Sequence, residues 1–269
     1  VRAGKIGVSA SWLNMTDLTD MPALRRKTGE LALRFRQEGV PLTTAMIADI
    51  NGVSMGYRDV LLENGVEFFF TNIHTHHGMY PLGQTQTPYF WENAEGKRLL
   101  VWNGEHYNLG NALGIIPVPG RNHMGEYYFG EQLPADALGI LHHNLEVYQK
   151  ELADTGYPYD FLITSLSGVF SDNAPPNPTA IRMIEAYNRT YSDIRLEMVS
   201  LPELYQRIRD QVSDAPVYRG DLNDWWANGV GSTPYAVKHY REAQALSHLC
   251  SRLEEKTGSK NGRLQQDMD

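Results

Sequence analysis

Short apolar runs that alternate with amphipathic helical patterns constrain the fold of this chain more than any other feature of its sequence. The strand-like runs cover residues 5–10, 42–48, 66–71, 160–166 and 194–199. The helical patterns cover residues 21–37, 52–63, 134–153, 178–188 and 201–212, and a further helix starts at 232–234. Because strands that alternate with helices are typical of βα units, the sequence predicts an α/β fold with a largely parallel sheet.

One stretch departs from this alternation. Residues 89–92 and 98–102 are both strand-like and are separated by five residues that include Gly96, which predicts a β-hairpin. A loop rich in Gly and Pro then runs from 103 to about 133. Loops of this length inside compact domains are usually functional or disordered, and the aromatic residues here favour a functional loop.

Composition excludes several classes of protein. The net charge of −8 at pH 7 comes without a stripe of Lys and Arg, which argues against nucleic-acid binding. No apolar run approaches the roughly 20 residues needed to span a bilayer. Cys250 is the only cysteine, so neither an internal disulfide nor a thiolate zinc site is expected. No secretory leader is recognisable at Val1, which slightly favours a cytoplasmic location.

Aromatic residues are concentrated in the predicted loops. The chain has 15 Tyr, 8 Phe and 5 Trp. Aromatic rings in polar loops suit carbohydrate, because sugar C–H faces pack on rings while the hydroxyls bind polar groups. Rings that fill gaps under long loops would give the same pattern, so the aromatic content alone leaves both interpretations open.

Polar residues follow several predicted strands directly, at the point where each strand ends. Asp49 comes immediately after the strand at 42–48. The residues that follow later strands in this way are His74, His76, Glu105, His106, Tyr107, Asp172 and Asn173. In barrels and open parallel sheets the site lies at the carboxyl ends of the strands, so we expect these side chains to line one site.

Glycoside hydrolysis needs two carboxyl groups, one to protonate the leaving oxygen and one to attack or to activate water. Asp49, Asp172 and Glu105 are the candidate carboxyl groups; Asp172 is the candidate proton donor by its location and chemistry, and Glu105 is the alternative donor. A separation of about 5–5.5 Å between the two carboxyl groups would predict retention, and about 6.5–9.5 Å would predict inversion. The candidate contacts to the sugar are His74, His76, Trp102, His106, Tyr107, Asn173, Trp225 and Trp226.

Each candidate also has an ordinary structural explanation. Asp49 equally suits the N-cap of the helix that follows it. His74 and His76 would point the same way in an extended segment, which suits a metal ion or sugar hydroxyls, although surface histidines often do neither. An aspartate such as Asp224 equally suits the cap of a turn.

Two segments resemble glycoside hydrolase family 38, the α-mannosidases. Asp49, Gly52 and Ser54 match the D-x-x-G-x-S spacing around the family's nucleophile. The second segment is the more specific match: a Gly-Asp pair, an aromatic-Trp pair, a Gly-containing loop and a Ser-x-Pro helix start, here residues 220–234. The resemblance runs from about residue 4 to 255 and is strongest over 42–80 and 217–240.

The resemblance implies an irregular (β/α)7-type barrel over residues 1–231, followed at 232–269 by the start of a helical domain. It implies that Asp49 is both the nucleophile of a retaining α-mannosidase-like enzyme and a zinc ligand. The family's histidine ligand corresponds to Asn223, so the neighbouring Asp224 is the candidate second ligand. Because a carboxylate is a hard ligand, Ca²⁺ and Mn²⁺ are alternatives to zinc.

The sequence also departs from the family in ways that keep two rivals open. The family's first strand carries a His-x-Asp pair, but no histidine precedes His74, so the first βα unit is expected to be missing. One rival is a catalytically impaired carbohydrate-binding relative that has lost its ligands. The other is a metal-dependent polysaccharide deacetylase, whose His-x-x-x-His pair this chain lacks. The expected ligand in every case is an oligosaccharide or glycoside.

Overall fold

The computed structural model describes residues 1–11, 18–48, 53–72, 81–117, 133, 135–167, 175–222 and 231–258. In chain order its elements are α1 (Met21–Gln37), β1 (Thr44–Ala48), α2 (Met55–Glu63), β2 (Phe68–Asn72), the 3-10 turn η1 (Pro81–Gly83), β3 (Thr87–Glu92), β4 (Arg98–Gly104), α3 (Leu109–Leu113), α4 (Ala137–Asp154), α5 (Thr179–Thr190), α6 (Leu201–Ile208), β5 (Val217–Tyr218) and α8 (Pro234–Thr257). This order confirms an α/β fold, in which helices and strands alternate from α1 to β2.

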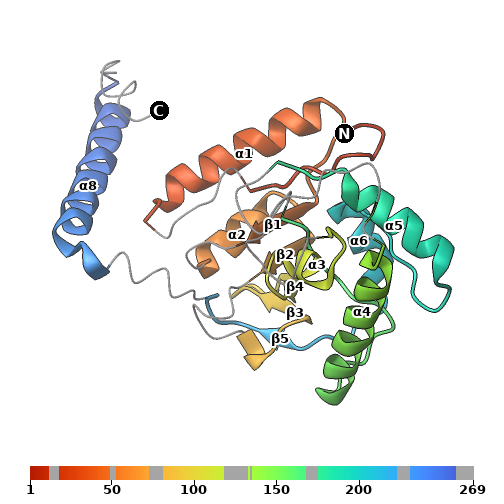
Figure 1. The fold of residues 1–269 in the computed structure, drawn as a ribbon. Helices are drawn as coiled ribbons and strands as arrows, with labels where there is room; N and C mark the ends of the chain where they lie inside the picture. The colour runs from red at the N-terminus through yellow and green to blue at the C-terminus, as the bar shows by residue number, and fades with distance from the viewer. Residues whose placement is uncertain are drawn as a thin grey trace.

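The strands form one five-stranded sheet in the order β1-β2-β4-β3-β5. Strands β1, β2 and β4 are parallel, β3 is antiparallel to β4, and β5 is parallel to β3. Figure 1 shows α1 and α2 on one side of this sheet and α4, α5 and α6 on the other. The protein is therefore a mixed α/β fold with a mostly parallel sheet covered on both faces.

Both faces of the sheet are apolar because its strands lie between two layers of helices. Alternate residues such as Phe69 and Val101 pack with α1 and α2 on one face. On the opposite face Phe68 and Trp102 pack with Ile208 of α6. A third cluster joins α3, α4 and α5. The central strands are consequently almost continuous runs of buried residues.

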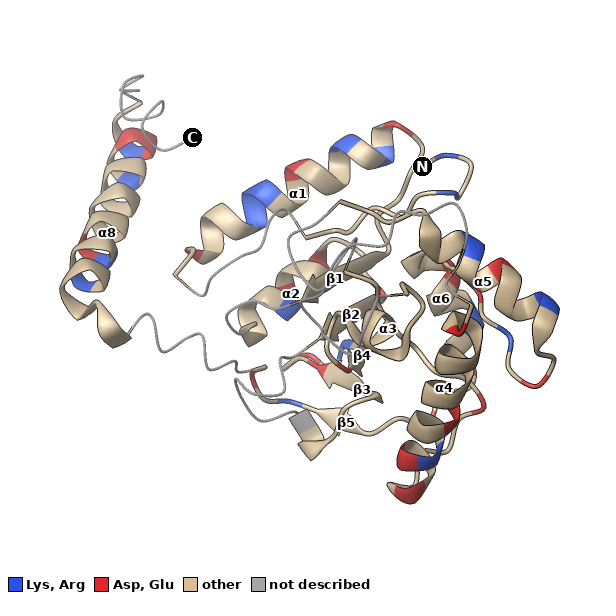
Figure 2. Ribbon diagram, in the orientation of Figure 1, with Lys and Arg blue, Asp and Glu red and all other residues tan. Residues whose placement is uncertain are grey.

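Helix α1 has the sequence features expected at both of its ends. The Asp20 side chain accepts a hydrogen bond of 2.7 Å from the Ala23 amide. Arg34 and Arg36 lie in the last turn, where positive charges interact favourably with the helix dipole. Arg25 binds Glu63 of α2 through a hydrogen bond of 3.0 Å. Figure 2 shows that basic and acidic residues lie near one another along α1 and α8.

The predicted hairpin and the predicted helices are confirmed, with shifts of a few residues at most ends. Helix α1 has the predicted bounds, and β3 and β4 pair in antiparallel register from Thr87 with Asn103 to Glu92 with Arg98. The stretch predicted as a loop from 103 to 133 contains the short helix α3. Gly110 of α3 approaches the segment at 164–166 so closely that a Cβ atom there would lie 2.9 Å from the Ser165 carbonyl oxygen.

Three predicted strands were wrong. Residues 5–10, 160–166 and 194–199 form no strand. Side chains take backbone groups that a ladder would use: Asn188 bonds both the amide and the carbonyl of Leu196, and Gln86 donates to the Ile163 carbonyl. Near the N-terminus, Ala10 donates one hydrogen bond to Thr44, at the edge of β1.

The described residues show an open five-stranded sheet and do not show a closed barrel. Within the same residues, no helix is both long enough and apolar enough to cross a membrane. The division of the chain at residue 231 stays a prediction, although α8 does begin at Pro234, as the Ser-Thr-Pro pattern predicted.

Candidate active site

The carboxyl ends of the three parallel strands lie level with one another. The ladders pair Ala48 of β1 with Asn72 of β2, and Asn72 with Gly104 of β4. Asp49 is the next residue after Ala48, and Glu105 is the next residue after Gly104. The last residues of these three strands, after which the candidate residues follow in the sequence, therefore lie side by side.

Most of the predicted site residues lie outside the described residues. They are Asp49, His74, His76, Asp172, Asn173, Asp224, Trp225 and Trp226. Their assignments remain predictions. Of the predicted set, the structure describes Trp102, Glu105, His106 and Tyr107.

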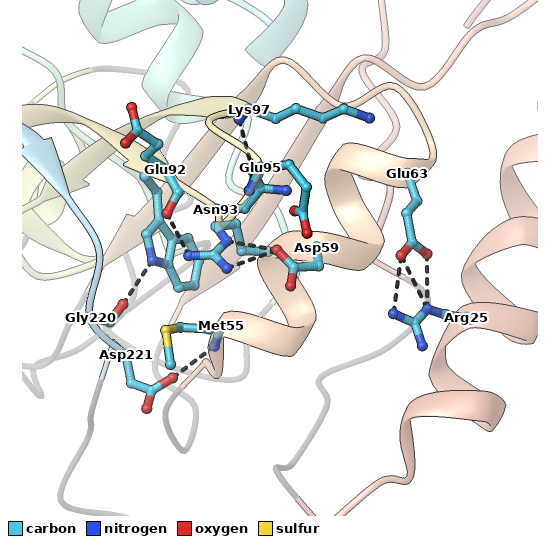
Figure 3. A network of polar contacts seen from close by, with 12 residues as sticks. Arg25, Met55, Asp59, Glu63, Glu92, Asn93, Glu95, Lys97, Gly220 and Asp221 are labelled. Carbon is cyan, nitrogen blue, oxygen red and sulfur yellow. Dashed lines mark hydrogen bonds and ion pairs between the residues drawn. The ribbon is translucent and has the colours of Figure 1, made fainter.

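The two segments that resemble the mannosidase family meet through their described ends. Val53, which follows the Asp49 segment, forms an antiparallel bridge with Leu222, with hydrogen bonds of 2.7 and 3.0 Å. The Asp221 carboxylate accepts a 2.7 Å hydrogen bond from the Met55 amide at the start of α2 (Figure 3). The residues just after the Asp49 segment are thus hydrogen-bonded to residues 221–222 of the second segment, far away in the sequence.

A partly buried polar network holds the second segment against the sheet. Arg98 and Arg219 both bind the Glu92 carboxylate, and these two hydrogen bonds lower the pKa of that carboxyl group. Arg58 of α2 is 4% exposed and donates a 2.8 Å hydrogen bond to the Glu92 carbonyl. The indole of Trp91 donates to the Gly220 carbonyl at 2.8 Å. Residues 219–221 are therefore fixed by both α2 and β3, and Figure 3 shows the hydrogen bonds of Gly220 and Asp221.

A cavity of about 430 Å³ opens beside the start of α1 and of α2. Its described lining residues are Thr19, Asp20, Met21, Pro22, Leu24, Ile47, Val53, Ser54, Tyr57, Arg241, Gln244, Ala245 and His248. Ile47 and Val53 lie close to Asp49 in the sequence, on either side of it. One wall belongs to α8, where Gln244 donates to the Leu18 carbonyl at 2.8 Å and His248 lies 3.3 Å from the Asp20 carboxylate.

Glu105 occupies the end of β4 and is tied to two other elements. Its backbone carbonyl accepts a hydrogen bond from the side-chain nitrogen of Asn72, and its carboxylate accepts one of 3.4 Å from the Tyr148 hydroxyl of α4. Burial raises the pKa of Tyr148 above its ordinary value, so the phenol stays protonated and acts as a donor. Glu105 is thereby held at the strand end by a side chain from a distant helix.

Trp102 is a core residue, which corrects its assignment to sugar binding. The side chain is fully buried, its indole donates to Gln86 at 3.1 Å, and its ring packs on Tyr159 and Phe161. The alternation of β4 points Trp102 into the sheet's apolar face, so its ring has no surface to offer. His106 and Tyr107 are half-buried, with ring centroids 4.2 Å apart.

The described residues do not form a zinc site. No three His, Cys, Asp or Glu side chains among them lie together in a way that could hold a metal ion. Both candidate ligands, Asp49 and Asp224, lie outside this part of the chain.

Comparison with known proteins gives a likeness of structure alone. No model of a known protein family matches the sequence, and no curated protein matches it either. Among solved structures, an α-mannosidase from Enterococcus faecalis V583 matches over 82% of this chain with a TM-score of 0.55. The two proteins share a fold. Their sequences are 12% identical, and the chain spans 22% of the length of that mannosidase.

Two residues of the site region were not predicted from the sequence. Tyr148 lies on the buried face of α4 with Leu141 and Leu145, and a tyrosine on an apolar face signals a hydroxyl that needs a partner. Asp221 was noted only as part of a motif, and its bond to Met55 spans 166 residues, which no local pattern reveals.

Proposed function

We propose that this chain is part of a family 38-like glycoside hydrolase that acts on α-linked sugars with retention. The proposal rests mainly on the observation that β1, β2 and β4 end side by side at one edge of the sheet. Candidate residues directly follow these strand ends in the sequence. The shared fold with an α-mannosidase supports the proposal. Closure of the sheet into an irregular barrel of the family 38 kind is part of the same proposal.

In the proposed mechanism Asp49 attacks the anomeric carbon and a second carboxyl group protonates the leaving oxygen. Water then hydrolyses the glycosyl-enzyme intermediate, and the second carboxyl group takes up the proton of that water. Asp172 or Glu105 is the proposed donor. The cavity beside Ile47 and Val53 offers space for a sugar unit, and the polar residues of α8 on its wall provide hydrogen-bonding groups.

The test is hydrolysis of 4-nitrophenyl α-glycosides by the wild-type chain and by Asp49→Asn. We expect the substitution to lower kcat about a thousandfold or more, because the amide cannot act as the nucleophile. Proton NMR of the first-formed sugar should show the α anomer. Asp154→Asn, at the end of α4, is the matched control and should keep full activity.

Full activity in Asp49→Asn would overturn the proposal. Zinc binding by Asp49 and Asp224 is tested on the same preparations by elemental analysis. The expected result is one bound zinc ion in the wild-type protein and a reduced content in Asp224→Ala. Ca²⁺ or Mn²⁺ in its place would point to the hard-ligand alternatives.

A further inference from the structure

Gln86 is a buried residue in an unusual backbone conformation. It is 1% exposed and has a φ of 49°, in the left-handed region that residues other than glycine rarely adopt. Such a conformation persists only where the surroundings hold it. Here the side-chain oxygen accepts from Trp102 at 3.1 Å, and the side-chain nitrogen donates to the Ile163 carbonyl at 2.8 Å.

The same nitrogen of Gln86 also donates to the Tyr148 hydroxyl oxygen, at 3.5 Å. Because that oxygen already accepts a hydrogen bond, the phenol's own proton is left for Glu105, whose carboxylate lies 3.4 Å away. The direction of donation thus runs from Gln86 to Tyr148 and from Tyr148 to Glu105. The Glu105 carboxylate is the last acceptor in this series of hydrogen bonds.

Asn72 supplies a second acceptor beside Glu105. Its side-chain nitrogen donates to the Glu105 carbonyl, whereas its side-chain oxygen has no hydrogen-bond partner among the described residues. Asn72 is 4% exposed. A buried acceptor without a donor is costly and is rare in folded proteins, so this oxygen calls for a donor that the described residues do not supply.

We propose that Glu105 and Asn72 form a subsite that accepts hydrogen bonds from sugar hydroxyl groups, with Tyr148 as the residue that positions Glu105. The ligand class rests on the proposed function, since it takes a carbohydrate as the substrate. Of the two candidate proton donors, this assignment makes Glu105 a hydroxyl acceptor and leaves proton donation to Asp172.

Binding of methyl α-D-mannopyranoside, measured by titration calorimetry in an Asp49→Asn background, tests the subsite without turnover. We expect Glu105→Gln to weaken binding about tenfold or more, and Tyr148→Phe several-fold, because each removes a hydrogen bond that involves a charged group. Tyr157→Phe is the matched control. It removes the same atom from a tyrosine whose hydroxyl bonds the Phe161 carbonyl instead, and it should bind as the background does.

The 2-, 3-, 4- and 6-deoxy forms of the same glycoside separate a direct contact from a general loss of structure. If Glu105 accepts from one hydroxyl, Glu105→Gln will cost no further affinity towards the sugar that lacks it, and will cost about tenfold towards the others. Three results would overturn the subsite. Glu105→Gln could lose the same affinity towards every sugar, or Tyr148→Phe and Tyr157→Phe could bind equally well. The third result is that the Asp49→Asn protein binds no sugar. The deoxy pattern without hydrolysis by the wild-type chain would instead overturn the proposed function alone.

Discussion

Tyr57 carries its hydroxyl into the apolar region between α1, α2 and the sheet. The residue is 3% exposed, and its hydroxyl shares a 2.5 Å hydrogen bond with Ser11. Burial raises the pKa of Tyr57 to about 12, and the bond to Ser11 offsets part of that rise. The neutral phenol is therefore favoured in the folded protein more strongly than in the unfolded chain.

This difference predicts alkaline instability. The unfolded tyrosine ionises near pH 10, whereas the folded one stays neutral, so folding stability is fully present below pH 10 and is lost as the pH rises towards 12. The loss attributable to Tyr57 is up to about 3 kcal/mol. Tyr57→Phe should flatten the dependence of the unfolding free energy on pH over this window, as measured by urea denaturation. An unchanged dependence would contradict the assignment.

At the residue scale, the sequence located the strand ends better than it judged the side chains beside them. Asp49 and Glu105 were identified by their positions after predicted strands, and β1 and β4 do end at the preceding residues. Trp102 was misjudged because a tryptophan near a strand end suits a sugar surface and a core equally well. Its ring lies in the core because β4 is a central strand and the rings of Tyr159 and Phe161 pack on it.

Among the elements, α2 shows how a distant segment can complete a helix. Ser54 stands at its N-cap position, yet its side chain makes no capping hydrogen bond. The Asp221 carboxylate instead accepts a hydrogen bond from the Met55 amide. Its negative charge at this end of the helix also interacts favourably with the helix dipole. The start of α2 and residues 217–222 therefore stabilise each other.

We expect Asp221→Ala to lower the unfolding free energy by about 1 kcal/mol, the usual cost of losing a helix cap. Ser54→Ala is the matched control and should change the unfolding free energy by less than about 0.5 kcal/mol, since that hydroxyl caps nothing. Hydrogen exchange of the Met55 amide should accelerate in Asp221→Ala alone. Equal effects of the two substitutions would show that Asp221 is not the cap.

Elements with local signals were predictable, and elements defined by pairing were not. Helix α1 was placed correctly because its apolar residues follow helical spacing. The runs at 160–166 and 194–199 were taken for strands because apolar residues favour extended backbone. Whether an extended segment joins a ladder depends on its neighbours in space, and Gln86, which is 77 residues from Ile163, is a neighbour that no local window of sequence contains.

For the whole molecule, the orientation of α8 is the most informative feature. The helix touches the segment before α1 through Arg241, Gln244 and His248, which are polar. Its leucines at 246, 249 and 253 are 62%, 46% and 51% exposed. The usual arrangement is thus reversed, because polar side chains face the rest of the protein while apolar ones face away.

Replacing Leu246, Leu249 and Leu253 together by Gln should therefore leave the unfolding free energy within about 0.5 kcal/mol of the wild-type value. Leu141→Ala provides the contrast, since that side chain is fully buried in α4 and its loss should cost about 3 kcal/mol. Urea denaturation measures both. A loss above about 2 kcal/mol in the triple variant would mean that these leucines are buried in the folded protein.

The hydrogen bond between Asp221 and Met55 also has a consequence for how the protein is made. The two residues are 166 positions apart, and a ribosome adds roughly 5–20 residues each second. Helix α2 therefore leaves the ribosome roughly ten to thirty seconds before the residue that caps it. During this time the Met55 amide at the start of α2 lacks its hydrogen bond to Asp221. The start of α2 is capped only after β5 and Asp221 have been synthesised.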